Sequence, residues 1–258
     1  MIDLTVVSYV STAIDMLEFS EDLLHAHTGK VPPYRRLIVT WDPSPEVAHW
    51  LDLHSNRIRR VEYRADPRLG YVPNLRGMMM LGWQTAFEMG DWLVHTDTDV
   101  AYGTGWLQEL LGYSSNPTPR TIVNCTHITP NVSGPHVITA NFGRPTWKEF
   151  DLTAFWKLHD QIRRPGCYET ADFRGGWEAT ATMPYLIHRQ WWEKCGPWEM
   201  TLDGKKEAPD RRFFRRCAEA GAKFVLACGS VVYHYEGGER RSGQRPGAAQ
   251  GLPEEGRV

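Results

Sequence analysis

Apolar runs typical of buried strands alternate with helical patterns along the first part of the chain, and this alternation constrains the fold more than any other feature. The expected strands are Leu4 to Val10, Arg36 to Trp41, Ile58 to Tyr63 and Asp91 to Thr96. The expected helices between them are Ile14 to His27, Glu46 to Leu53 and Leu75 to Met89. Strands connected through helices predict an α/β fold, with a single doubly wound, mainly parallel sheet flanked by helices.

The second half of the chain continues this pattern less regularly. Further strands are expected at Thr121 to Cys125, Met183 to His188, Lys223 to Ala227 and Val231 to Tyr235, and further helices at Phe150 to Arg163 and Arg211 to Ala220. We therefore expect one domain over residues 1–236, which a chain of 258 residues can form with a substantial core. Residues 237–258 are rich in Gly, Arg, Glu and Pro, a composition that predicts a flexible tail.

Charge and cysteine usage narrow the class of protein. The chain has 29 Lys and Arg residues against 31 Asp and Glu residues, so it has no overall field that would attract nucleic acid. Its five cysteines include no CxxC pair, which argues against a zinc site or a disulfide framework. No stretch has the length and apolarity of a transmembrane segment, and the first residues lack the basic start of a signal peptide. We expect a soluble, cytoplasmic protein.

Two acidic residues directly after the fourth expected strand are the sharpest chemical signal. Asp97 and Asp99 are separated by one residue, so on an extended backbone both carboxylates point to the same side. Carboxylate oxygens suit Mn²⁺ or Mg²⁺, ions that also bind phosphate. Asp42 follows another strand, and ligands of such sheets bind beyond the carboxyl ends of strands. The alternative is that Asp97-Thr98-Asp99 is a solvated turn.

The context of the acidic pair resembles glycosyltransferase family 2 and related GT-A enzymes. The residues that carry the resemblance are Ala86 to Gly90 at a helix end, the strand leading to Asp99, and the following helical run Trp106 to Leu111. The resemblance implies a hexosyltransferase-type enzyme that takes a UDP- or GDP-sugar donor and a glycan or other hydroxyl acceptor. It also implies a nucleotide-binding half, residues 1–111, and an acceptor-side half, residues 112–236.

The same resemblance assigns residues to the donor and the metal. Tyr9 at the first strand end is expected to contact the nucleoside, Asp42 the base, and Arg76 the ribose or diphosphate, while Asp97 serves both donor and metal. His234, at the end of a late strand, is expected to join Asp97 and Asp99 as a metal ligand. Each residue also has an ordinary alternative: a turn residue for Asp42, a solvated charge for Arg76 and a hydrogen-bonded structural residue for His234.

An inverting transferase needs a carboxylate that accepts the proton of the attacking hydroxyl. The family places such an acid just before a helix, and Asp210 occupies that position, with Glu207 as its rival. The alternative for Asp210 is an acid that only stabilises the first turn of the helix. Gly176 and Trp177 are expected on the acceptor side, since glycine permits close approach of the backbone and the indole can stack on a sugar; a plain glycine turn with a core tryptophan is the alternative.

Three other classes remain open. A nucleotidyltransferase would use related acids and Mg²⁺, but it is expected to have a basic, glycine-rich loop after the first strand, where this chain has Ser8 to Ala13. A glycoside hydrolase would need only two facing carboxylates. A non-catalytic nucleotide- or glycan-binding domain would keep the fold without the reaction.

Overall fold

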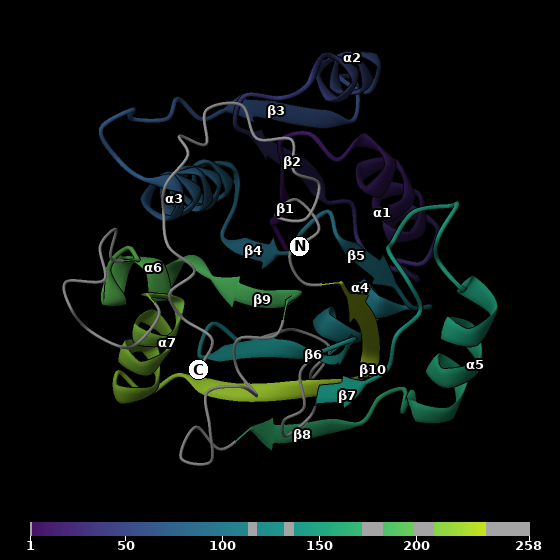
Figure 1. The fold of residues 1–258 in the computed structure, drawn as a ribbon. Coiled ribbons are helices and arrows are strands. Elements are labelled where there is room, and N and C mark those ends of the chain that lie inside the picture. Colours follow the sequence, from purple (N-terminus) through teal and green to yellow (C-terminus); the bar gives the residue numbers. More distant parts are fainter. Residues whose placement is uncertain (1, 113–117, 132–136, 172–182, 199–208, 236–258) are drawn as a thin grey trace.

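The computed structural model describes residues 2–112, 118–131, 137–171, 183–198 and 209–235. Within these residues, ten strands form one sheet with helices on both of its faces (Figure 1). The strands are β1 (Leu4–Val10), β2 (Arg35–Thr40), β3 (Ile58–Glu62), β4 (Trp92–His95), β5 (Val100–Tyr102), β6 (Thr121–Thr129), β7 (Val137–Thr139), β8 (Tyr168–Ala171), β9 (Tyr185–His188) and β10 (Lys223–His234). Their order is β3-β2-β1-β4-β9-β6-β10-β5, with β7 paired to β6 and β8 paired to β10.

Strand directions determine which residues meet at one edge of the sheet. β1 is parallel to β2 and β4, and β2 is parallel to β3. β9 is antiparallel to both β4 and β6, so β6 runs in the same direction as β4, and β10 is parallel to β6. The carboxyl ends of β1, β2, β4, β6 and β10 therefore lie at a common edge, the usual ligand-binding edge of an open α/β sheet.

The helices cover the two faces through separate apolar clusters. They are α1 (Ile14–Ala26), α2 (Pro45–Leu53), α3 (Tyr71–Met89), α4 (Trp106–Leu111), α5 (Leu152–Ile162), α6 (Arg189–Cys195) and α7 (Pro209–Glu219). One cluster joins α1, α4 and α5 to the sheet through Phe19, Trp106 and Phe155. A second joins α3, α6 and α7 through Trp83, Trp191 and Phe213, and Figure 1 shows these helices on the opposite face. A third cluster packs α2 on the sheet through Val47, Leu51 and Ile58.

β1 shows why the sequence of a central strand is continuously apolar. Val6 belongs to the cluster on the α1 face, whereas Val7 and Tyr9 belong to the cluster on the α3 face. Because both faces are covered, every residue of β1 is buried and the polar–apolar alternation of a half-exposed strand is missing. The predicted α/β class, with one sheet between helices, is confirmed.

The sheet is more mixed than the sequence predicted, since β5, β8 and β9 are antiparallel to their neighbours. β10 is one strand where two were predicted, and its pairing with β6 shifts register between Ala227 and Val231. A Cβ atom on Gly229 in this irregular segment would lie 2.5 Å from the carboxyl carbon of Glu109. The glycine thus allows β10 to continue past a buried side chain of α4, and its turn-like sequence concealed the strand.

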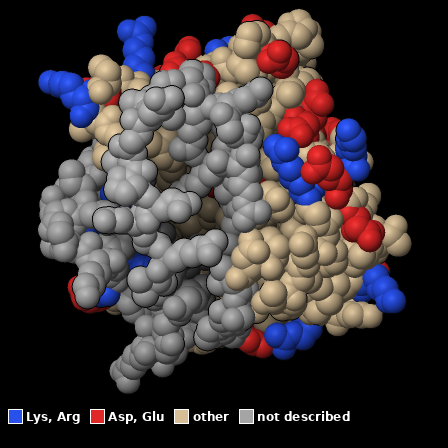
Figure 2. All heavy atoms as spheres, viewed as in Figure 1, with Lys and Arg blue, Asp and Glu red and all other residues tan. Residues whose placement is uncertain are grey.

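Among the described residues, no helix has the length and apolarity needed to cross a membrane. On the face drawn in Figure 2, acidic and basic side chains of the described residues lie interspersed, in keeping with the balanced charge of the sequence. The predicted tail, residues 237–258, lies outside the described residues.

Candidate active site

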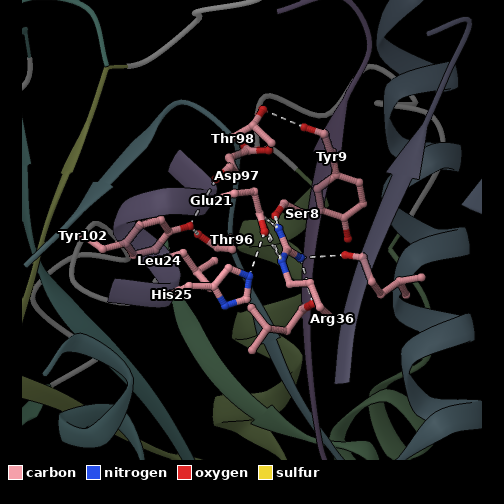
Figure 3. Close-up of polar contacts among 12 residues, drawn as sticks. Ser8, Tyr9, Glu21, Leu24, His25, Arg36, Thr96, Asp97, Thr98 and Tyr102 are labelled. Atoms are coloured by element: carbon pink, nitrogen blue, oxygen red, sulfur yellow. Dashed lines mark hydrogen bonds and ion pairs between the residues drawn. The ribbon is translucent and has the colours of Figure 1, made fainter. Parts of the chain in front are cut away.

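The acidic motif Asp97-Thr98-Asp99 lies between β4 and β5, and hydrogen bonds of Thr98 and of the preceding Thr96 fix its backbone. The Thr96 amide donates a hydrogen bond to the Val7 carbonyl (3.0 Å), and the Thr98 hydroxyl donates to the Tyr9 carbonyl (3.0 Å). The Tyr102 hydroxyl contacts the Thr96 hydroxyl (2.7 Å) and donates to the Asp97 carbonyl (3.3 Å; Figure 3). Both threonines are buried, and their hydrogen bonds anchor the motif to the end of β1.

β10 brings His234 to this motif. In the antiparallel pairing of β10 with β5, His234 lies opposite Val100, and the Tyr235 amide donates to the Asp99 carbonyl at 3.1 Å. The His234 Nε2 atom is 3.1 Å from Asp99 Oδ1. One ligand atom from each of Asp97, Asp99 and His234 lies within 4.8 Å of the others. The structure therefore places together the three residues that the sequence predicted as metal ligands.

The donor set fits a divalent cation. Mg²⁺ takes oxygen ligands at about 2.0–2.1 Å in octahedral geometry, which places adjacent ligand atoms about 3 Å apart. The 3.1 Å between the imidazole nitrogen and the Asp99 oxygen is close to this separation, and it is also the length of the direct contact between the two side chains. Two carboxylates and one imidazole suit Mn²⁺ or Mg²⁺ better than the softer metals that prefer thiolates. The side chains of His234 and Asp99 are only 13% and 12% exposed, so water screens them weakly.

A buried ion pair lies behind the end of β1. Arg36 of β2 donates through Nε to both carboxylate oxygens of Glu21 in α1, each at 3.1 Å, and its Nη1 donates to the carbonyls of Val6 (2.9 Å) and Leu37 (2.7 Å). Its Nη2 contacts Ser8 and Glu21 (Figure 3). Burial alone would raise the pKa of Glu21, but Arg36 and His25 outweigh it and hold that pKa at about 2. The pair joins α1, β1 and β2 directly beneath the site.

Tyr9 does not present its ring to this edge. The ring is 4% exposed and belongs to the apolar cluster on the α3 face. Its hydroxyl donates to the Met79 carbonyl (3.3 Å) and lies 3.3 Å from His95 Nδ1, to which the Trp83 indole also donates (2.9 Å). Burial lowers the pKa of His95 to about 3, so this histidine is neutral. This placement favours a packing role for the Tyr9 ring rather than the predicted contact with the nucleoside. The backbone of Tyr9 lies beside the Asp97-Thr98-Asp99 motif.

Asp42 and Arg76 flank the same edge. Asp42 lies two residues after the end of β2, is exposed and has φ 45°, a left-handed conformation that aspartate tolerates better than most residues. Its turn is joined to the segment after β1 by the Ser44 amide, which donates to the Ser11 carbonyl at 3.0 Å. Arg76 is half-buried in the second turn of α3. Because α3 ends where β4 begins, the start of this helix lies at the ligand-binding edge.

Sequence reasoning missed two features at this edge. Trp41 stacks on Tyr71 with ring centroids 5.5 Å apart and 24° between the planes, which places an aromatic pair beside Asp42. His127, near the end of β6, stacks on His234 with centroids 5.3 Å apart and 22° between the planes. Burial and the neighbouring His234 lower the pKa of His127 to about 3, against a smaller opposing effect of Asp99. The predicted end of β6 at Cys125 had left His127 out of the strand.

The predicted base and acceptor residues are only partly described. Asp210 was predicted just before the helix and is the second residue of α7, but the position of its side chain lies outside the described part of the structure. Glu207, Gly176 and Trp177 lie entirely outside the described residues. These four roles therefore remain predictions.

No protein-family model matches the chain, and no curated protein matches it. Solved structures do share its fold. GalNAc-T7, solved with UDP, GalNAc and Mn²⁺, matches over 92% of this chain with a TM-score of 0.60 and 12% identity. S. aureus TarS matches over 91% with a TM-score of 0.61 and 9% identity. Both are GT-A-type glycosyltransferases. The chain has a GT-A fold.

The GT-A fold of this chain corresponds to part of each neighbour. The chain spans 45% of the GalNAc-T7 structure and 37% of the TarS structure. A shorter TarS structure, residues 1–349, matches with a TM-score of 0.59 and 9% identity, and the chain spans 61% of it. The likeness at this level of identity is one of fold. The chemistry of the GT-A site must therefore be argued from this chain's own residues.

Proposed function

We propose that this protein is a metal-dependent glycosyltransferase that moves a hexosyl group from a nucleoside diphosphate sugar to a hydroxyl of a glycan or similar acceptor. The observation that carries the proposal is the cluster of Asp97, Asp99 and His234 at the ligand-binding edge of a GT-A sheet. Two carboxylates and an imidazole would hold Mn²⁺ or Mg²⁺. When bound, such an ion neutralises the negative charge that develops on the departing diphosphate.

The remaining residues at the edge fit a nucleotide. The Trp41–Tyr71 pair offers an aromatic face for a base, and the neighbouring Asp42 carboxylate can accept a hydrogen bond from a base N–H group. Arg76 brings a cation to the start of α3, where it can contact ribose or diphosphate oxygens. UDP and GDP both carry the base N–H group that this arrangement requires. GalNAc-T7, a structural neighbour, was solved with UDP.

We propose inversion at the anomeric carbon, with Asp210 accepting the proton of the acceptor hydroxyl and Glu207 as the alternative base. Gly176 and Trp177 would contribute to the acceptor side.

All five cysteines are free thiols, which supports a reducing, cytoplasmic location.

Calorimetry with UDP and GDP, each with and without Mn²⁺, tests the proposal. Wild-type protein should bind one of them in a metal-dependent manner, and Asp99→Ala should lose that dependence. Asp91→Ala is the matched control, because Asp91 is an acid with a 58% exposed side chain at the opposite end of β4. Equal nucleotide affinity with and without metal in the wild type would contradict the metal site, and no binding of either nucleotide would contradict the donor assignment.

A further inference from the structure

His127 lies on the same face of the sheet as the proposed metal ligand His234. In the parallel pairing of β6 with β10, His127 lies opposite Val232, two residues before His234. Residues two apart on a strand point to the same side. The stacked rings, with centroids 5.3 Å apart, confirm that the two imidazoles adjoin. The sheet thus brings a second imidazole beside the cluster of Asp97, Asp99 and His234 without including it in that cluster.

The Nε2 atom of His127 is buried and has no hydrogen-bond partner among the residues that the structure describes. The residue is only 7% exposed, so solvent does not readily satisfy this nitrogen. A buried polar atom without a partner costs free energy, and such atoms in native proteins usually have a specific explanation. A protonated imidazole nitrogen donates a hydrogen bond. With a proton on Nε2, His127 offers a donor beside the metal ligands.

We propose that His127 Nε2 donates a hydrogen bond to an oxygen atom in the coordination shell of the bound metal. That oxygen belongs to a metal-bound water or to a donor phosphate, which share the same acceptor chemistry. His127 is then a positioning residue that orients a ligand of the metal rather than binding the metal. The inference rests on the proposed metal-dependent function and deepens it. It also explains why an imidazole remains unpartnered at this point of the core.

The test compares His127→Phe with His127→Gln by calorimetry, using Mn²⁺ alone and Mn²⁺ with the nucleoside diphosphate that wild type binds. Phenylalanine keeps the ring and its stacking but removes the nitrogens, whereas glutamine keeps a side-chain donor. Loss of an outer-shell partner typically lowers metal affinity about 10–100-fold, and we expect this loss for His127→Phe. His127→Gln should stay close to wild type. An effect with Mn²⁺ alone identifies a metal-bound water, and an effect only with nucleotide identifies a phosphate oxygen.

The melting temperature provides a second, independent readout. Replacing a buried, unpartnered polar group by an apolar group of similar shape is neutral or stabilising, so His127→Phe should melt at or above the wild-type temperature while binding Mn²⁺ more weakly. His159→Phe is the matched control, since His159 is also buried with an unpartnered Nε2 but packs on Trp156 of α5. Its metal affinity should not change.

Wild-type metal affinity for His127→Phe in both arms would overturn the inference, and so would His127→Gln binding as weakly as His127→Phe. If His127→Phe does not fold, His127→Leu makes the same comparison. A wild-type protein that binds neither Mn²⁺ nor nucleotide would instead contradict the proposed function, so the two failures are distinguishable.

Discussion

At the scale of single residues, Asp210 separates the chemistry of transfer from the binding of the donor. Asp210→Asn keeps the side-chain shape and its place in the first turn of α7 but removes the capacity to accept a proton. We expect sugar transfer to fall about 10²–10⁴-fold, the usual effect of losing a general base. Donor affinity and melting temperature should barely move. Initial rates of nucleoside diphosphate release with saturating acceptor measure the change.

Glu207→Gln is the companion variant. If it abolishes transfer while Asp210→Asn does not, the base is Glu207. If neither variant loses activity, the inverting assignment is wrong, because a reaction that retains configuration does not need this base.

Strand positions in the sequence predicted which candidate metal ligands would lie together, whereas their role as ligands stays a prediction. Asp97, Asp99 and His234 all follow or end strands whose apolar runs are visible in the sequence, and the sheet brings such ends together. Tyr9 is different, because β1 is buried on both faces and its sequence does not indicate which helix layer each side chain meets. His127 was missed because the predicted strand ended at Cys125, whereas β6 continues to Thr129.

At the scale of elements, the close approach of α3 to β1 depends on Gly82. A Cβ atom at this position would lie 2.8 Å from both Cε1 and the hydroxyl of Tyr9, and 3.0 Å from Cγ2 of Val39. Glycine inside a helix is unfavourable by about 1 kcal/mol relative to alanine. Here it allows a helix whose start carries Arg76 to pack directly on the strand that anchors the acidic motif.

Gly82→Ala should therefore destabilise the protein even though it improves helix propensity. Overpacking a buried contact typically costs about 1–3 kcal/mol, which exceeds the gain of about 1 kcal/mol from alanine. Tyr9 cannot move away easily, because its ring is enclosed and its hydroxyl is bonded to the same helix. Thermal unfolding measures the effect, and Gln84→Ala, at an exposed position of α3, is the control with little expected change. A higher melting temperature for Gly82→Ala would contradict the close-packing argument.

Helices were predicted more accurately than strands in the second half of the chain. α5 and α7 lie within one or two residues of their predicted bounds, since a helix pattern is local. β5 and β8 have three and four residues, and pairing with the distant β10 rather than local sequence makes them strands. Such short strands depend on tertiary context, which one sequence does not reveal.

At the scale of the whole molecule, the buried Arg36–Glu21 pair makes the free energy of unfolding depend on pH. The pair joins α1 to β2, and Arg36 also bonds to carbonyls of β1 and β2. Both side chains are at most 2% exposed, so water does not stabilise either charge. Each charge is stabilised mainly by its partner. Removing one partner of a buried pair typically costs about 3–5 kcal/mol, because an unpaired charge remains. Glu21→Gln should therefore lower the free energy of unfolding at neutral pH by about that amount.

The pH dependence follows from the pKa of Glu21, about 2 in the folded protein against an ordinary value of 4.5. Above pH 4.5 the carboxylate is ionised in both states and its contribution to stability is complete. Between pH 4.5 and 2 the unfolded chain takes up the proton while the folded protein does not, so stability falls with falling pH, by about 3 kcal/mol in all. Urea unfolding of wild type and Glu21→Gln from pH 7 to pH 3 should show the larger part of this loss, about 2 kcal/mol, only in the wild type. Glu62→Gln, which removes a 58% exposed partner of Arg60, should keep the wild-type slope. A Glu21→Gln protein that loses stability in acid as steeply as the wild type would show that other carboxylates, rather than this pair, control acid unfolding.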